Sequence, residues 1–249
     1  MILGFIRRRW RKRSSNAYIS YLRKKGVRIG NNVNFYGDLQ RIDIDLTRPS
    51  LIKIGDNVEI VSPFSIITHG FEWSVFREKY HEIVGSSGTV SIGNNVYIGA
   101  DVTVLKGARI GNNVVVGAKS LVNKNIDSDC VAVGTPAKKI MNLDDFFEKR
   151  KKEHIDEAKE YALSIYQVYK RLPVEEDFIE FFPLFLKRDK QSIDSFNEKL
   201  KMKMKKEKRN IMSVQSQLGI AYEKFMKSQP CYETFEDFLK DAGIPVKSN

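Results

Sequence analysis

The chain has 249 residues, of which 42% are hydrophobic and 29% are charged, a composition that excludes membrane bundles and disordered chains and provides for a sizeable core. The formal net charge is +11, but residues 1–28 contain ten Lys and Arg and no Asp or Glu, so the rest of the chain is nearly neutral. A nucleic-acid binder would spread basic side chains over a folded surface, so this class is disfavoured and we expect no nucleic-acid partner.

The N-terminal segment joins an apolar start, residues 1–6, to a basic run, residues 7–13, that includes Trp10. It is not typical of a secretory signal, because the charges follow the apolar residues and the apolar stretch is too short. Two interpretations remain open. Residues 1–13 dock on an anionic membrane surface, or they form a solvated arm that aids solubility.

The cysteines indicate the compartment. Cys130 and Cys231 lie far apart in the sequence and neither has a partner at metal-ligand spacing, which is typical of reduced thiols in a cytosolic protein. No segment has the length of apolar sequence that a transmembrane helix needs. We therefore expect a cytoplasmic protein, with a peripheral position at the inner face of the cytoplasmic membrane if the N-terminal segment docks there.

A six-residue repeat runs through the first half of the chain. Each of six consecutive units begins with Ile or Val, at Ile92, Ile98, Val104, Ile110, Val116 and Val122. This period fits neither a helix nor an ordinary half-buried strand, but it suits a short strand followed by a turn, three of which form one coil of a parallel β-helix. The Gly-Asn-Asn triplets supply residues that tolerate positive φ at the corners. Earlier copies begin at Ile29 and Ile54, and the frame is broken between Ile54 and Ile92, which predicts an insertion.

The repeats and the closing segment Val133-Gly-Thr-Pro-Ala-Lys-Lys-Ile140 resemble the hexapeptide-repeat acyltransferases. Within that family the chain is similar to the bacterial sugar O-acetyltransferases related to the galactoside, maltose and virginiamycin acetyltransferases. The resemblance implies a mainly β fold, a left-handed parallel β-helix of hexapeptide repeats. We expect three parts: a basic N-terminal arm at 1–28, the β-helix acyltransferase domain at 29–141 with a loop insertion at about 68–91, and an α-helical C-terminal extension at 142–249.

His69 is the candidate general base. It opens the insertion, and the stretch from Thr68 to Ser74 resembles a His-Gly-x-Asp-Trp-Ser sequence of some family members. A sugar hydroxyl is a poor nucleophile until a base removes its proton, and an imidazole suits that task. His81, beyond the insertion, is the rival base or an acceptor-binding residue, whereas His154 falls in a charged helical stretch.

Two further residues of the insertion are candidates for the site. Glu72 is a candidate to orient the imidazole of His69. Trp73 either stacks on a sugar ring or anchors the loop. The β-helix carbonic anhydrases hold zinc with three histidines, but here only His69 and His81 lie in the coil region, so we expect no metal.

The resemblance implies acetyl-CoA as co-substrate, with its pantetheine arm extended along the coil. The backbone amide of Ala100 is then the candidate donor to the oxyanion. The residues implied to contact the coenzyme are Gly99, Ala100, Ala118, Lys119, Lys124, Lys138 and Lys139. The resemblance also implies a homotrimer with each active site between two coils, and a carbohydrate acceptor.

Beyond Asn142 the repeat disappears, and apolar residues recur at helical spacing at Ile155, Ala158, Ala162 and Ile165. This region contains no catalytic constellation, and it caps the coil, recognises the acceptor or docks a partner. The leading hypothesis is an acetyl-CoA-dependent O-acetyltransferase acting on a sugar hydroxyl of a surface polysaccharide or its lipid-linked precursor, by direct attack with His69 as general base. The alternatives are an N-acetyltransferase acting on an amino sugar or antibiotic, and a non-catalytic trimeric scaffold.

Overall fold

The computed structural model describes residues 10–207 and 212–246. The chain divides into two compact units, the first ending at Glu148 and the second beginning at Lys149. No helix in these described ranges is long and apolar enough to cross a membrane.

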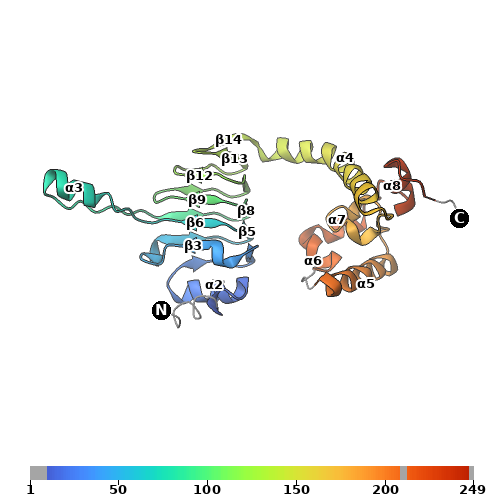
Figure 1. The fold of residues 1–249 in the computed structure, drawn as a ribbon, viewed down its shortest axis with the longest axis horizontal. Coiled ribbons are helices and arrows are strands. Elements are labelled where there is room, and N and C mark those ends of the chain that lie inside the picture. Colours follow the sequence, from blue (N-terminus) through green and yellow to red (C-terminus); the bar gives the residue numbers. More distant parts are fainter. Residues whose placement is uncertain (1–9, 208–211, 247–249) are drawn as a thin grey trace. The chain divides into compact units, whose positions relative to one another are not determined.

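Three parallel sheets form the body of the first unit (Figure 1). Sheet A contains β1 (Arg28–Ile29), β4 (Ile52–Ile54), β7 (Val90–Ile92) and β10 (Arg109–Ile110). Sheet B contains β2 (Val33–Tyr36), β5 (Val58–Val61), β8 (Val96–Ile98), β11 (Val114–Val116), β13 (Cys130–Gly134) and the antiparallel β14 (Ala137–Asn142). Sheet C contains β3 (Ile42–Ile44), β6 (Phe64–Ile66), β9 (Val102–Val104) and β12 (Leu121–Val122). The chain visits the sheets in the repeating order A, B, C, so the predicted parallel β-helix of six-residue units is confirmed.

The aliphatic positions of the repeat stack into buried columns. In sheet A, Ile54 pairs with Ile92, Ile92 pairs with Ile110, and all three side chains are almost fully buried. Burial of each such side chain stabilises the fold by roughly 1.5–3 kcal/mol. A strand shifted by one residue would turn this column outward, so the repeat fixes the register.

The Asn residues of the repeat form the corner between sheets A and B. Asn57, Asn95 and Asn113 have φ values of 55°, 54° and 55°, a conformation that Asn tolerates better than most residues. The Asn95 side-chain amide donates to Oδ1 of Asn113 at 2.8 Å, which links successive coils. A Cβ atom at Gly93 would lie 2.4 Å from the Gly111 carbonyl oxygen, so glycine is required where the coils stack.

The first coil is covered by α2 (Ser15–Lys24). The Ser14 side chain caps this helix by accepting a hydrogen bond from the Ala17 amide, and Tyr18, Ile19 and Leu22 are buried in the coil's core. Part of the segment expected to be an arm is therefore a helix packed on the coil. Residues 1–9 of that segment lie outside the described residues.

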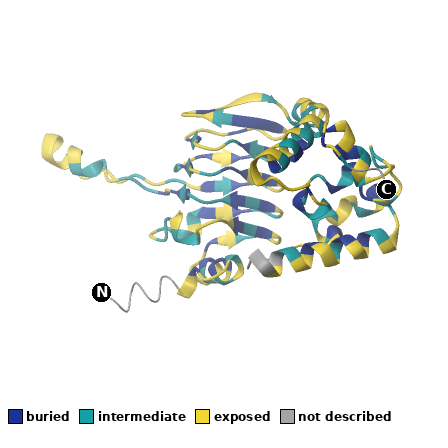
Figure 2. Cartoon of the chain, turned by 45° about the vertical axis from the view of Figure 1, so that its right-hand side comes forward, coloured by how far each residue is buried: buried dark blue, intermediate teal, exposed yellow. Residues whose placement is uncertain are grey.

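The insertion is a hairpin that projects from sheet C. Its two limbs are joined by a hydrogen bond from the Gly88 amide to the Thr68 carbonyl at 2.9 Å. At its tip lies α3 (Trp73–Tyr80), which has no buried residue in this single chain. Figures 1 and 2 show α3 held away from the three sheets, with most of its surface exposed. Short 3-10 turns, η1 (Leu39–Arg41) and η2 (Pro49–Leu51), flank β3.

Helices form the second unit. The long α4 (Leu143–Tyr169) contains the division between the units, and α5 (Lys190–Glu207), α6 (Val214–Leu218), α7 (Tyr222–Met226) and α8 (Phe235–Asp241) follow, with the 3-10 turns η3 (Glu175–Asp177), η4 (Phe182–Leu184) and η5 (Gly219–Ala221). Their core is rich in aromatic rings that contact Phe178. Helices cover more of the described residues than strands do, so the expectation of a mainly β protein holds for the first unit and is wrong for the chain as a whole.

Two lysines of α5 have acidic partners within the helical unit. The ammonium of Lys203 lies 2.6 Å from the buried Asp177 carboxylate, and Arg171 contacts the same carboxylate at 2.7 Å. Although burial opposes ionisation, the hydrogen bonds from Arg171 and Lys203 lower the pKa of Asp177 to about 2. Lys199 pairs with Glu175 in the same way. These ion pairs tie this part of α5 to η3.

Candidate active site

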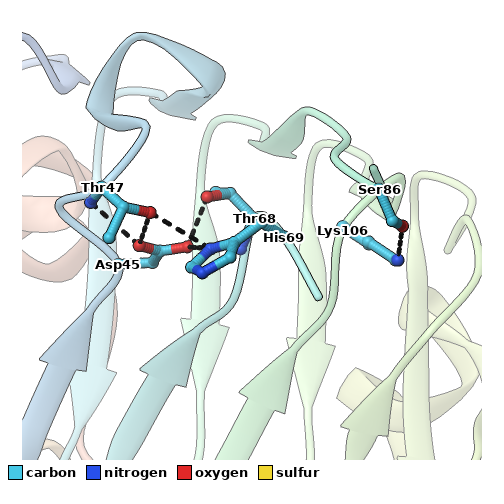
Figure 3. Close-up of polar contacts among 6 residues, drawn as sticks. All are labelled: Asp45, Thr47, Thr68, His69, Ser86 and Lys106. Atoms are coloured by element: carbon cyan, nitrogen blue, oxygen red, sulfur yellow. Dashed lines mark hydrogen bonds and ion pairs between the residues drawn. The ribbon is translucent and has the colours of Figure 1, made fainter. Parts of the chain in front are cut away.

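His69 lies at the corner where sheet C ends and the insertion begins. Strand β6 ends at Ile66, and the chain continues through Thr68 to His69. The imidazole Nδ1 lies 2.6 Å from Oδ2 of Asp45 and 3.1 Å from Oγ1 of Thr47, which both follow β3 on the neighbouring coil (Figure 3). The corner therefore joins residues from two successive coils.

Asp45 is held by hydrogen bonds to its two carboxylate oxygens. The backbone amide and hydroxyl of Thr68 donate to Oδ2 at 3.0 Å and 2.5 Å, and the Thr47 hydroxyl donates to Oδ1 at 2.6 Å. Burial opposes ionisation, but these hydrogen bonds from Thr47 and Thr68 outweigh it and hold the pKa of Asp45 well below its usual range. Asp45 is consequently a carboxylate that can only accept hydrogen bonds.

The carboxylate sets the tautomer of His69. Because Asp45 only accepts, Nδ1 of His69 must donate to it, and in the neutral imidazole the lone pair then resides on Nε2. No described residue forms a hydrogen bond with Nε2, and 18% of the side chain is exposed. The geometry leaves Nε2 available to take a proton from a bound molecule.

Aromatic rings extend from His69 along the start of the insertion. The Phe71 ring contacts the imidazole edge-on, with 5.4 Å between ring centres, and the Trp73 ring follows at 5.9 Å from Phe71. Phe71 is 67% exposed, so its ring beside the imidazole is accessible to a bound molecule. Sequence reasoning selected Trp73 and missed Phe71, which is the ring that touches the histidine.

Glu72 does not orient His69, and that expectation is wrong. Its carboxylate lies 2.5 Å from the Lys106 ammonium, which also contacts the Ser86 hydroxyl. The hydrogen bond from Lys106 is the main reason that the pKa of Glu72 falls to about 2. Lys106 stands on the coil after β9, while Glu72 and Ser86 stand on the two limbs of the insertion. This contact anchors the insertion to the coil, and Asp45 performs the role that was expected of Glu72.

The signal for Asp45 lay in the register of the coils. Ile44 pairs with Ile66, so the residues after β3 lie beside the residues after β6. The amide of Asp45 donates to the Ile66 carbonyl at 3.0 Å, which continues that register into the corner. Aligning the first coil on the second would have placed Asp45 and Thr47 next to Thr68 and His69.

The other two histidines belong to other elements than this corner. His81 is the exposed C-terminal cap of α3, with a φ of 57°. Figure 1 shows α3 at the tip of the projecting insertion. His154 is in α4 and belongs to the second unit. Within the described ranges, no group of three His, Cys, Asp or Glu side chains is placed to hold a metal ion. The structure therefore does not bring His81 to the candidate base.

Most of the expected coenzyme residues gather at the corner between sheets B and C. Ala100 follows β8 and Ala118 follows β11, and a Cβ atom on Gly99 would lie 2.6 Å from the Ala118 nitrogen. The Lys119 amide donates to the Ala100 carbonyl at 2.8 Å. In the described part of the chain, the amides of Ala100 and Ala118 have no acceptor. This corner thus presents main-chain donors.

The lysines divide between two corners. Lys138 and Lys139 are exposed on β14, where Lys138 pairs with Val133 of β13. The β13–β14 turn is joined to the Ala118 corner, because the Thr135 hydroxyl donates to the Lys119 carbonyl at 3.2 Å. Lys124 instead follows β12 of sheet C and lies at the corner that carries His69, two coils away.

The candidate base and the candidate oxyanion donor occupy opposite ends of sheet C. Ala100 precedes β9, whereas His69 lies beyond the end of β6, the strand that pairs with β9. The three-residue strands and their flanking residues separate the two groups by roughly 15–20 Å, at about 3.3 Å per residue. A single chain therefore does not assemble the two groups around one reacting atom.

Comparisons with known proteins agree with the repeat. The model of the bacterial transferase hexapeptide family (six repeats) matches residues 89–124. Protein CapG of Staphylococcus aureus is 38% identical over 153 residues, which cover 59% of this chain and 84% of that protein. Galactoside O-acetyltransferase of Escherichia coli (strain K12) is 34% identical over 128 residues, 51% of this chain and 59% of that protein. Among solved structures, a hexapeptide-repeat-containing acetyltransferase from Vibrio cholerae O1 biovar eltor, in complex with acetyl coenzyme A, is 26% identical over 48% of this chain and 61% of that chain, with a TM-score of 0.34.

Proposed function

The chain is an acetyltransferase of the hexapeptide-repeat family, and we propose that it transfers the acetyl group of acetyl-CoA to a sugar hydroxyl. The observation that carries the proposal is the contact of His69 Nδ1 with the Asp45 carboxylate, which leaves Nε2 as a proton acceptor at an open corner. The similarity to a galactoside O-acetyltransferase supports a sugar as the acceptor. A sugar of a surface polysaccharide, or of its lipid-linked precursor, is the acceptor we propose.

The reaction is a direct transfer. Nε2 of His69 accepts the hydroxyl proton as the sugar oxygen forms a bond with the acetyl carbonyl carbon. The carbonyl oxygen becomes negative and is stabilised by a main-chain amide. When the oxyanion collapses, the carbon–sulfur bond breaks and the coenzyme thiolate takes the proton from the imidazolium. Asp45 stays ionised throughout and stabilises that imidazolium.

The amide comes from a second copy of the chain in this proposal. The Ala100 amide has no acceptor among the described residues but lies at the other end of sheet C from His69. Three copies related by a closed rotation bring the His69 corner of each coil to the Ala100 corner of its neighbour. We therefore propose a homotrimer of left-handed coils with three shared active sites.

The coenzyme lies along the corner between sheets B and C. The free amides of Ala100 and Ala118 supply donors for the thioester and the pantetheine arm. Lys138 and Lys139 are placed to attract the coenzyme's phosphates, with Lys119 on the same corner. Lys124 reaches a coenzyme only from the His69 side of the shared site.

The acceptor sugar rests on the aromatic rings beside the base. Sugars present apolar C–H faces that pack on aromatic rings, and Phe71 is exposed next to the His69 imidazole. Trp73, which follows Phe71, extends this platform. His81, at the tip of the insertion, contributes to acceptor binding only if a long acceptor or a neighbouring copy reaches it.

A panel of acceptors tests the function. Coenzyme A release from acetyl-CoA is measured with galactosides, other sugars and amino sugars, and the products are identified by mass spectrometry. We expect an ester on a sugar hydroxyl. An amide as the main product would instead establish the N-acetyltransferase, and no transfer to any acceptor, with the trimer intact, would favour the scaffold.

A further inference from the structure

The surface of α2 that faces away from the coil is basic. Arg11 and Arg13 precede the helix, Lys24 and Lys25 end it, and all four side chains are exposed. No Asp or Glu occurs in the sequence before Asp38. In the described part of the chain, none of these four cations forms an ion pair, so their charge is available to a partner.

The same surface contains a shallow groove lined by two aromatic side chains, the exposed Trp10 and the half-buried Tyr21. The groove has a volume of about 800 Å³ and is lined by Trp10, Arg11, Arg13, Tyr21 and Lys24, among others. Trp10 is 66% exposed, and the Arg13 guanidinium lies 3.9 Å from the centre of its ring. The Arg11 guanidinium lies 4.4 Å from the Tyr21 ring. We call these five residues the α2 groove.

The groove is fixed to the coil. Tyr18, Ile19 and Leu22 of α2 are buried in the core, and the Lys12 ammonium donates to the Ile42 carbonyl on the first coil. The basic residues are therefore displayed on a folded element rather than on a solvated arm. A partner that binds the groove would fix the orientation of the whole coil.

We propose that the α2 groove docks the protein on a bilayer of anionic phospholipids. Each basic residue near such a surface strengthens binding by about fivefold. Tryptophan prefers the boundary between headgroups and acyl chains, and an arginine stacked on it brings charge and ring to the same depth. The sequence that precedes Trp10 adds apolar residues, Ile2, Leu3, Phe5 and Ile6, next to three further arginines. Basic side chains combined with apolar insertion are what stable attachment to a bilayer requires.

A nucleic acid is the weaker candidate. Its phosphates would satisfy the cations, but it offers no apolar layer for the residues that precede Trp10. The docking inference does not depend on the acetyl-transfer reaction, because vesicle binding is measured without substrate.

Co-sedimentation with vesicles tests the proposal on the full chain. Phosphatidylcholine vesicles are compared with vesicles that also contain phosphatidylglycerol. We expect binding only to the anionic vesicles, with a loss of binding as salt is raised, because the cations are exposed and screened. The triple variant Arg11→Glu, Arg13→Glu, Lys24→Glu should bind at least about 100-fold more weakly. Equal binding to both kinds of vesicle, or to neither, would overturn the proposal.

A matched variant separates a local site from net charge. Lys187, Lys190 and Lys227 are exposed on the helical unit, and their triple change to Glu alters the net charge by the same amount. Binding of this control to anionic vesicles should stay close to that of the unmodified chain. An equal loss in both triple variants would mean that no local site exists. Thermal unfolding of both variants checks that the folds are intact.

Tryptophan fluorescence reports the depth of docking. The chain has two Trp residues, so the Trp73→Phe variant leaves Trp10 as the single reporter. Its emission should shift to shorter wavelength when anionic vesicles are added and stay unchanged with a single-stranded oligonucleotide. Tighter binding of the oligonucleotide, with no shift on vesicles, would replace the membrane by a nucleic acid and contradict the proposal.

Discussion

Two corners of the coil carry the candidate site, and they use different parts of the chain. At the corner after sheet C the candidate groups are side chains, because Asp45, Thr68 and His69 form a hydrogen-bonded group. At the corner between sheets B and C the candidate groups are main-chain donors, because the amides of Ala100 and Ala118 have no acceptor among the described residues. The repeat itself generates the free amides of the second corner, whereas the hydrogen-bonded side chains of the first corner gather where the insertion interrupts the repeat.

This difference explains how a monotonous fold supports catalysis. A six-residue repeat fixes each coil so closely that a free amide recurs at equivalent positions without any special side chain. Side-chain chemistry requires residues that depart from the six-residue repeat, and His69 lies where the insertion interrupts that repeat. Substitutions should therefore act differently at the two corners, which the following experiments exploit.

Removal of the candidate base should have the largest effect. His69→Ala should lower kcat by about 10²- to 10⁴-fold with little change in thermal stability, because the imidazole is partly exposed and its loss leaves the coil intact. His81→Ala serves as the control and should retain activity, since His81 lies at the tip of the insertion. A large loss in His81→Ala with normal activity in His69→Ala would reverse the assignment.

Removal of the amide at the second corner should come next. Asp101 has a φ of 64°, as at the third position of a type II turn, and proline is common at the second position of such turns. Ala100→Pro thus removes the N–H group while the corner keeps its shape, and kcat should fall by about 10²- to 10³-fold. Ala100→Ser keeps the amide and should change kcat little. Equal loss in both variants would show that the side chain, rather than the amide, matters.

Asp45→Asn should lower kcat on the order of 10²-fold, because the new amide can donate to Nδ1 and move the imidazole proton to Nε2. The exposed Asp43→Asn, on the adjacent strand, is the control.

The ionised form of Asp45 should also stabilise the folded protein, because its pKa is lowered there. This contribution to stability is fully present above the ordinary pKa of a carboxyl group. It is lost as the pH falls toward the lowered pKa of the folded state. The free energy of unfolding of the unmodified chain and of Asp45→Asn is measured from neutral pH downward. The advantage of the unmodified chain should shrink as the pH falls, and an advantage that grew would contradict a lowered pKa of Asp45.

The smallest effect is expected at the aromatic platform. Phe71→Ala should raise KM for the sugar by roughly threefold to tenfold with a smaller change in kcat, because stacking holds the acceptor but does not move a proton. Initial rates across acceptor concentrations separate the two constants. An unchanged KM would remove Phe71 from the acceptor site.

The sequence predicted the coil because its aliphatic columns recur at a fixed step, and it predicted His69 because that residue stands where the step breaks. It did not reveal Asp45, because the contact between Asp45 and His69 depends on the register between two successive coils. The first of these coils, which contains β3, shows the six-residue repeat only weakly in its sequence. The packing of α2 was missed for another reason. Tyr18, Ile19 and Leu22 follow a helical spacing after Ser14, but the many basic residues around them are equally typical of a solvated arm. The direction of the Glu72 side chain depends on Lys106, a contact between distant segments that no local pattern encodes.

Mixed assemblies of two variant chains test the proposed shared site most directly. His69→Ala and Ala100→Pro chains with different affinity tags are co-expressed, and assemblies that contain both are purified and assayed for acetyl transfer. If each site combines His69 of one chain with Ala100 of its neighbour, one of the three interfaces in a mixed trimer is complete, and activity should return to about one third of the unmodified enzyme. If mixed assemblies stay as inactive as either parent, the site lies within one chain and the account is wrong.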